Sequence, residues 1–138
     1  MRVIQPICEG HWLCMWRRMP PRDLKERTRL FALAVVKFCR KLPTTDEAKE
    51  AARQLRRAAN STRSNYRASR KGRSREEFQA KLQIACEEAD ECVDWLQYLR
   101  DAGIGTDAVL LQEAREIASI LTVAVRTARA NTARLKSL

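Results

Sequence analysis

The chain has 138 residues, of which 45% are hydrophobic and 32% are charged, and it contains only four glycines and four prolines. This length is typical of one domain that buries its core without disulfide or metal staples. Alanine, leucine, arginine and glutamate dominate the composition, which favours helices and argues against strands. The formal net charge is +10, and it is not spread evenly along the chain.

The first 21 residues show no clear periodicity and end in a Pro-Pro pair that favours extended backbone. Glu9, Gly10 and His11 interrupt the apolar stretch, so neither a secretory signal nor a membrane span is expected there. We predict an irregular head over residues 1–21, whose first 18 residues are either dispensable or an extension upstream of the native start, and a four-helix-bundle domain over residues 22–138.

The cysteine count is odd, which fits reduced thiols better than a disulfide framework. The five cysteines are Cys8, Cys14, Cys39, Cys86 and Cys92. Together with the absence of a targeting segment, this pattern predicts a cytoplasmic protein that does not associate with membranes.

Four amphipathic helices are predicted, with approximate bounds of 23–41, 44–71, 74–103 and 106–127. Asp23 is the expected N-cap of the first helix, and Ser74 with Glu77 forms a capping box at the third. Gly72 and Gly103 supply stops, and the tail beyond Thr127 is expected to fray because it loses most large apolar residues.

Apolar and small residues recur at three-and-four spacing and define the expected core. The expected core residues are Leu24, Phe31, Ala34, Val35, Phe38, Leu42, Leu55, Ala58, Ala59, Thr62, Tyr66, Ser69, Phe78, Leu82, Ala85, Ala89, Val93, Leu96, Leu99, Leu110, Leu111, Ala114, Ile117, Leu121, Ala124 and Ala128. Short connections make successive helices antiparallel, which predicts an all-α, up-down-up-down four-helix bundle. A three-helix bundle with the first helix swung away is the structural alternative.

The second helix carries a formal charge of +5, and the third, from Arg73 to Asp101, carries −4. The basic residues of the second helix and the following turn are Arg53, Arg56, Arg57, Arg63, Arg67, Arg70, Lys71 and Arg73. A row of cations on a rigid helix displaces counterions from phosphates, so this face predicts binding of RNA or DNA. The alternative is a solvated surface that the acids of the third helix partly neutralise. Tyr66 points toward the core side, so base stacking is not expected.

Four further residues are candidates for contacts between subunits. Ser61 and Asn65 lie one helical turn apart beside small residues, where they either form a hydrogen bond within the chain or meet another subunit. Trp95 and Tyr98 extend a second stripe with Ile84, which either widens the core or indicates an oligomer interface.

Enzymatic chemistry is not expected. A di-iron bundle needs Glu-x-x-His motifs on two helices, whereas the one histidine, His11, lies in the head. Cys8, His11 and Cys14 lack a fourth zinc ligand nearby, and neither a phosphate-binding glycine loop nor a nucleophile with its base is present. We therefore predict no catalytic residues, no metal and no cofactor.

Several segments in order carry a family resemblance over roughly residues 23–128: Asp23-Leu24-Lys25-Glu26-Arg27-Thr28, Phe31-Ala32, Leu42-Pro43, Gln54-Leu55-Arg56-Arg57-Ala58-Ala59, Ser61, Asn65-Tyr66-Arg67-Ala68, Arg73-Ser74, Glu77-Phe78, Lys81-Leu82, Glu87-Glu88-Ala89-Asp90-Glu91 and Trp95-Leu96. They resemble the bacterial four-helix-bundle proteins named after members encoded in intervening sequences of 23S ribosomal RNA genes. Where many relatives have a Glu-Gly pair, this chain has Ala68-Ser69.

The resemblance implies a bundle that assembles into a ring-like homopentamer. A distant branch, the accessory variability determinants of diversity-generating retroelements, partners a reverse transcriptase and binds nucleic acid through basic surfaces. The leading hypothesis is thus a non-enzymatic oligomeric bundle that binds RNA or another polyanion. The runner-up is a structural or protein-interaction module without nucleic-acid binding, and salt-dependent RNA binding separates the two.

Overall fold

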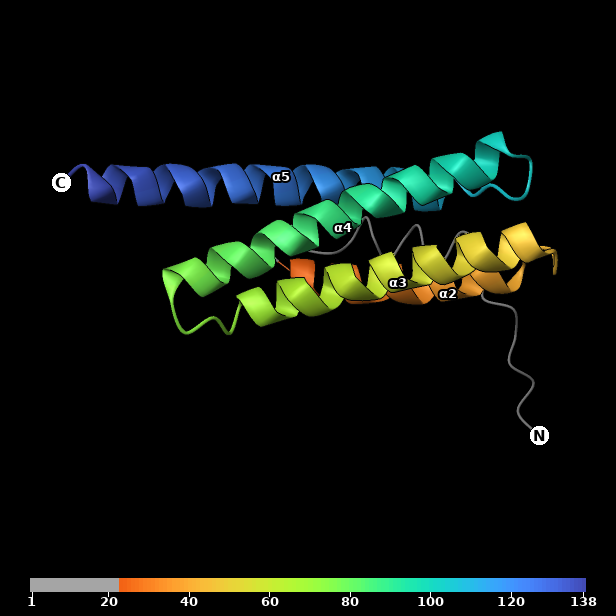
Figure 1. Cartoon of the computed structure of the whole chain (residues 1–138), viewed down its shortest axis with the longest axis horizontal. Coiled ribbons are helices and arrows are strands. Elements are labelled where there is room, and N and C mark those ends of the chain that lie inside the picture. The colour runs from red at the N-terminus through yellow and green to blue at the C-terminus, as the bar shows by residue number, and fades with distance from the viewer. Residues whose placement is uncertain (1–22) are drawn as a thin grey trace.

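A computed structural model describes residues 23–138, and the predicted head lies outside the described residues. Four helices follow one another: α2 (Leu24–Arg40), α3 (Asp46–Ser69), α4 (Arg75–Asp101) and α5 (Ala108–Lys136). Each helix packs antiparallel against the next, as Figure 1 shows, and α2 returns to contact α5 only weakly. The predicted up-down-up-down bundle is confirmed. Within residues 23–138, no helix is long and apolar enough to cross a membrane.

Local capping explains where the helices begin. The N-caps are Asp23, Thr45, Ser74 and Asp107, and the side chain of each accepts a hydrogen bond from the backbone N–H three residues later. The capping box at the start of α4 differs from the usual pattern in one detail. The Glu77 carboxylate accepts a hydrogen bond from the backbone N–H of Arg73 at 2.8 Å, and not from the backbone N–H of the N-cap residue Ser74. At the other end of α4, Gly103 adopts a φ of 69° that favours glycine.

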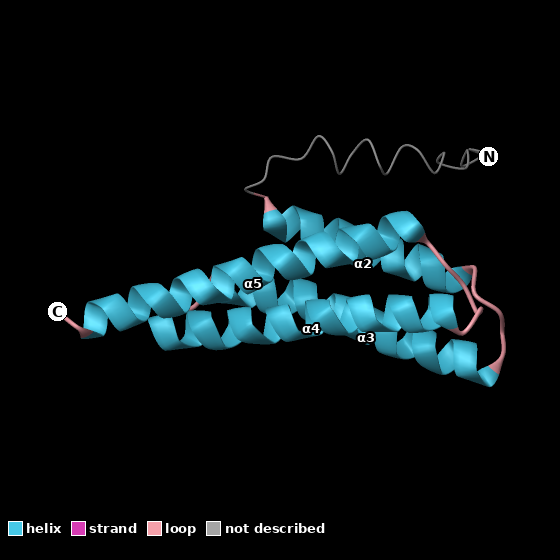
Figure 2. Ribbon diagram, turned by 90° about the horizontal axis from the view of Figure 1, so that it is seen from above, coloured by secondary structure: helices cyan, strands magenta, loops and turns pink. Residues whose placement is uncertain are grey.

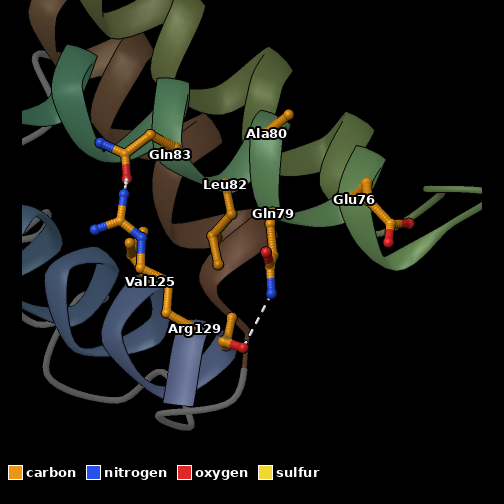
Figure 3. Close-up of a pocket in the computed structure, with 8 residues that line it drawn as sticks. Glu76, Gln79, Ala80, Leu82, Gln83, Val125 and Arg129 are labelled. Carbon is orange, nitrogen blue, oxygen red and sulfur yellow. Dashed lines mark hydrogen bonds between the residues drawn. The ribbon is translucent and has the colours of Figure 1, made fainter. Parts of the chain in front are cut away.

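The expectation that the tail frays beyond Thr127 is wrong, since α5 remains helical to Lys136. The Gln79 side-chain amide of α4 donates to the Ala128 carbonyl at 3.0 Å (Figure 3). It also donates to the Thr132 hydroxyl, and the two contacts fix the far part of α5. In both views of the whole chain, α5 extends past the turn between α3 and α4 (Figures 1 and 2).

The core contains most of the predicted apolar residues, with corrections at its edge. Seven predicted members are only partly buried and pack against the core margin: Ala34, Leu42, Tyr66, Phe78, Val93, Ala124 and Ala128. Buried residues outside the prediction include Thr28, Leu30, Ala32, Ala48, Ala51, Ala52, Glu113 and Val125. Cys39 and Cys92 are buried, as expected of cysteines that serve as small core side chains. The early turns of α3 were missed because alanines carry little hydrophobic signal yet allow two helices to approach closely.

An ion pair joins α2 to α5, where apolar contact is sparse. The Arg27 guanidinium donates to the two carboxylate oxygens of Glu113 at 2.6 and 2.8 Å and also contacts Glu116. The Glu113 side chain is only 4% exposed. Hydrogen bonding to Glu113 raises the pKa of the Arg27 guanidinium further above its ordinary value, so Arg27 stays charged at physiological pH. This contact replaces part of the apolar packing that holds the other neighbouring helices together.

Candidate nucleic-acid interface

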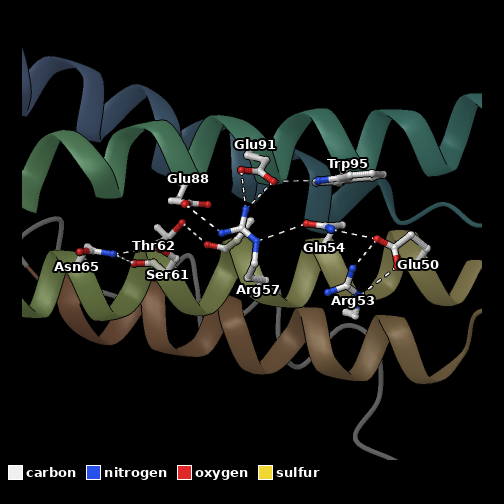
Figure 4. Close-up of polar contacts among 11 residues, drawn as sticks. Glu50, Arg53, Gln54, Arg57, Ser61, Thr62, Asn65, Glu88, Glu91 and Trp95 are labelled. Atoms are coloured by element: carbon white, nitrogen blue, oxygen red, sulfur yellow. Dashed lines mark hydrogen bonds and ion pairs between the residues drawn. The ribbon is translucent and has the colours of Figure 1, made fainter.

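The eight predicted basic residues lie on α3 and in the turn that follows it, but their surroundings differ. Arg53 and Arg57 are engaged by carboxylates, as Figure 4 shows. No ion pair with another described residue is formed by the other six: Arg56, Arg63, Arg67, Arg70, Lys71 and Arg73. The structure therefore divides the predicted face into a neutralised part and a free part.

Arg57 connects α3 to α4. Its guanidinium donates to both oxygens of Glu91 at 2.8 and 2.9 Å and to Glu88 at 3.2 Å. Hydrogen bonds to Glu91 and then to Glu88 raise the pKa of Arg57. Burial raises the pKa of Glu91, yet hydrogen bonds from Arg57 and Trp95 outweigh burial and leave that pKa below its ordinary value. Arg57 is thus charged but already paired with two carboxylates.

Arg53 is neutralised within its own helix. Its guanidinium donates to Glu50 at 2.7 and 3.1 Å, three residues earlier on α3. This exposed pair is of the kind that contributes little to stability. Its effect on the interface is to lower the positive potential at the N-terminal half of α3.

The free cations extend from the middle of α3 to the turn after it. Arg63 donates to the Asn60 side-chain carbonyl at 3.0 Å, a neutral partner that leaves its charge uncompensated. Arg67, Arg70, Lys71 and Arg73 follow within about three helical turns and are exposed. Uncompensated guanidinium groups at this density suit phosphate oxygens, which they bind bidentately.

The polar interface candidates Ser61 and Asn65 bind each other within one helix. The Asn65 amide donates to the Ser61 carbonyl at 2.9 Å and to its hydroxyl at 3.0 Å. The hydrogen bond within the chain is therefore present, although it spans one turn of α3 and not a crossing between helices.

The aromatic candidates form a separate cluster on α4. The rings of Trp95 and Tyr98 meet edge to face, with centroids 5.5 Å apart. Trp95 packs against the core margin, whereas Tyr98 is 51% exposed. In Figure 4 the Arg57 ion pairs lie between Trp95 and the Ser61–Asn65 pair, so the four candidates form two sites.

The described residues offer no cluster of three or more His, Cys, Asp or Glu side chains that is able to hold a metal. Burial raises the pKa of Cys39 to about 11 and that of Cys92 to about 12. Both thiols are therefore protonated at neutral pH and behave as small core side chains. Cys8, His11 and Cys14 lie outside the described residues.

Comparison with known proteins agrees with this architecture. The model of the 23S rRNA-intervening sequence protein family matches residues 23–123. A crystal structure of a protein with unknown function from the S23 ribosomal protein family of Bacteroides thetaiotaomicron superimposes with a TM-score of 0.66. The two sequences are 26% identical, and the match covers 75% of this chain and 95% of that chain. No curated protein matches the chain. The chain belongs to the 23S rRNA-intervening sequence protein family.

Proposed function

We propose that this chain is a non-enzymatic, oligomeric protein of the cytoplasm that binds RNA or another nucleic acid through the free basic residues of α3. The observation that supports the proposal best is that six of the eight predicted cations have no carboxylate partner among residues 23–138. If these arginines served only to keep the protein soluble, we would expect more of them to form ion pairs with the nearby acids of α4.

The expected contacts are to the nucleic-acid backbone. Arginine and lysine side chains on a rigid helix bind phosphates without reading bases, and affinity then depends steeply on salt. Tyr66 is partly buried against the core, so the free basic residues have no aromatic side chain on α3 with which to stack a base. The proposed binding is therefore electrostatic and weakly selective for sequence.

The triple variant Arg56→Ala/Arg63→Ala/Arg67→Ala tests the α3 face. If each side chain contacts one phosphate, the slope of log affinity against log salt becomes shallower by about 2 to 3 for RNA. Fluorescence anisotropy with a labelled RNA, titrated from low to high salt, measures this slope. The matched control Lys49→Ala/Arg53→Ala/Arg115→Ala removes the same charge from other positions. Equal losses in the two variants, or no RNA binding at low salt, would contradict the proposal.

A role in protein assembly is the second candidate, and the exposed Tyr98, which meets the Trp95 ring edge to face, favours it. The burial of solvent-exposed apolar side chains of α4 by another subunit lowers the free energy of the assembly. The family resemblance makes a homopentamer the expected assembly, with a partner protein such as a reverse transcriptase as a further occupant.

The variant Tyr98→Glu is expected to reduce the solution mass from that of an oligomer toward the 15.9 kDa of one chain. A charge placed in an interface is desolvated, whereas the same charge on a free surface costs little. Light scattering after gel filtration measures the mass, and Val123→Glu, at a 61% exposed position of α5, is the control. A wild-type chain that is monomeric at micromolar concentration would refute this assembly.

A further inference from the structure

Charge is distributed unevenly along the long axis of the layer formed by α3, α4 and α5. The half next to the α3–α4 turn, residues 62–88 and 122–138, contains eleven Lys and Arg against four Asp and Glu. The other half, residues 46–61 and 89–121, contains six against ten. The division falls where the Thr122 hydroxyl contacts α4. Within this three-helix layer, one half is therefore strongly basic and the other is acidic. Residues 23–45 pack beside the second half, through contacts such as that of Arg27 with Glu113, and add six Lys and Arg against two Asp and Glu, so that end of the bundle is neutral overall.

The far part of α5 contributes much of this excess. No acidic residue follows Glu116 in the sequence, whereas Arg126, Arg129, Arg134 and Lys136 all do. None of these four cations forms an ion pair with another residue of the described range 23–138. They are thus available to an external anion.

The structure holds this segment at the same end as the α3–α4 turn. Arg129 donates to the Gln83 side-chain carbonyl at 2.8 Å, beside a surface pocket between α4 and α5 (Figure 3). About one helical turn after Arg129, the Thr132 hydroxyl accepts a hydrogen bond from the Gln79 side-chain amide. Arg134 and Lys136 lie beyond these anchors on the overhanging end of α5, exposed and without an ion pair to any described residue.

We propose that the overhanging end of α5 is a second nucleic-acid-binding arm, with Arg134 and Lys136 contacting the same phosphodiester backbone as the end of α3. The first arm consists of Arg67, Arg70, Lys71 and Arg73. This inference rests on the proposed function and adds a contact outside α3. The proposed binding surface then includes residues of both α3 and α5 at the basic end of the bundle, and is not limited to one face of α3.

An extended polyanion fits this arrangement better than a single phosphate group does. The cations project from two separate elements, and they do not converge on one buried point with fixed donors. Repeated phosphates along a backbone are able to engage both arms at once, and each engaged cation adds to the counterions released. RNA and DNA share this chemistry, and oligonucleotides of the same sequence in each form show which of them is preferred.

The test is the variant Arg134→Ala/Lys136→Ala in the full chain, titrated with labelled RNA and DNA over a range of salt. The slope of log affinity against log salt is expected to become shallower by about 1.4 to 1.8, since two phosphate contacts are lost. The matched control Lys49→Ala/Arg115→Ala removes two exposed cations from the opposite half and is expected to leave the slope nearly unchanged. Circular dichroism should show the same helix content for all three chains.

The outcomes separate this inference from the proposed function. If wild type binds, the α3 triple variant weakens binding and the α5 variant matches wild type, the second arm is refuted and the α3 face stands. If wild type binds neither RNA nor DNA at low salt, both proposals fail. If the α5 variant and its matched control lose equal affinity, the effect is one of net charge and the second arm is again refuted.

Discussion

Replacement of Glu113 by alanine is expected to lower the free energy of unfolding by about 3 kcal/mol. The Glu113 carboxylate is almost completely buried and binds the Arg27 guanidinium through two hydrogen bonds. Its removal leaves a partly buried cation with only the exposed Glu116 as partner, and the cost of that desolvation is no longer compensated. Urea or thermal unfolding followed by circular dichroism measures the change.

Two companion variants show whether charge or volume causes the effect. Glu116→Ala removes a half-exposed partner and is expected to cost less than about 1 kcal/mol. Replacing both members, as in Arg27→Met/Glu113→Leu, removes the unpaired charge and is expected to recover most of the lost stability. If Glu113→Ala unfolded no more easily than Glu116→Ala, the bidentate contact between α2 and α5 would not exist in solution.

The second large effect is expected for Leu121→Ala, which should destabilise the bundle by about 3 kcal/mol. Leu121 is fully buried in the core, and its truncation leaves a cavity that α4 and α5 cannot fill without moving. For a chain of this size the loss corresponds to a fall in melting temperature on the order of 10 °C, measured by calorimetry.

The neighbouring variant Val123→Ala is the matched control because it deletes apolar atoms from the same helix at an exposed position. Its expected effect lies within about 0.5 kcal/mol. The contrast between positions two residues apart depends on the rotation of α5 about its axis. Equal losses at both positions would mean that a different face of α5 is turned toward the core.

The starts of the helices could be predicted because caps act locally. Asp23, Ser74 and Asp107 each satisfy backbone donors within three residues, and this information is contained in a few consecutive letters. The antiparallel order followed from short connections alone. The overall fold was therefore accessible without knowledge of any contact between distant residues.

The parts that could not be predicted depend on partners far apart in the sequence. Glu113 carries no local sign that it is buried, because its partner Arg27 is 86 residues away. The order of α5 beyond Thr127 depends on Gln79, a polar residue of another helix. The predicted basic face could not be divided into paired and free cations until the geometry showed that Arg57 reaches Glu88 and Glu91.

The concentration of positive charge at one end of the bundle, with the other end neutral overall, makes the charge distribution uneven along the long axis. In the field of a polyanion, this asymmetry turns the basic end forward before any contact is made. The orientation acts within about one Debye length, roughly 8 Å at physiological salt, which is short compared with the 29-residue α5. Encounters would therefore occur end-on, with the α2–α3 and α4–α5 turns facing away from the polyanion.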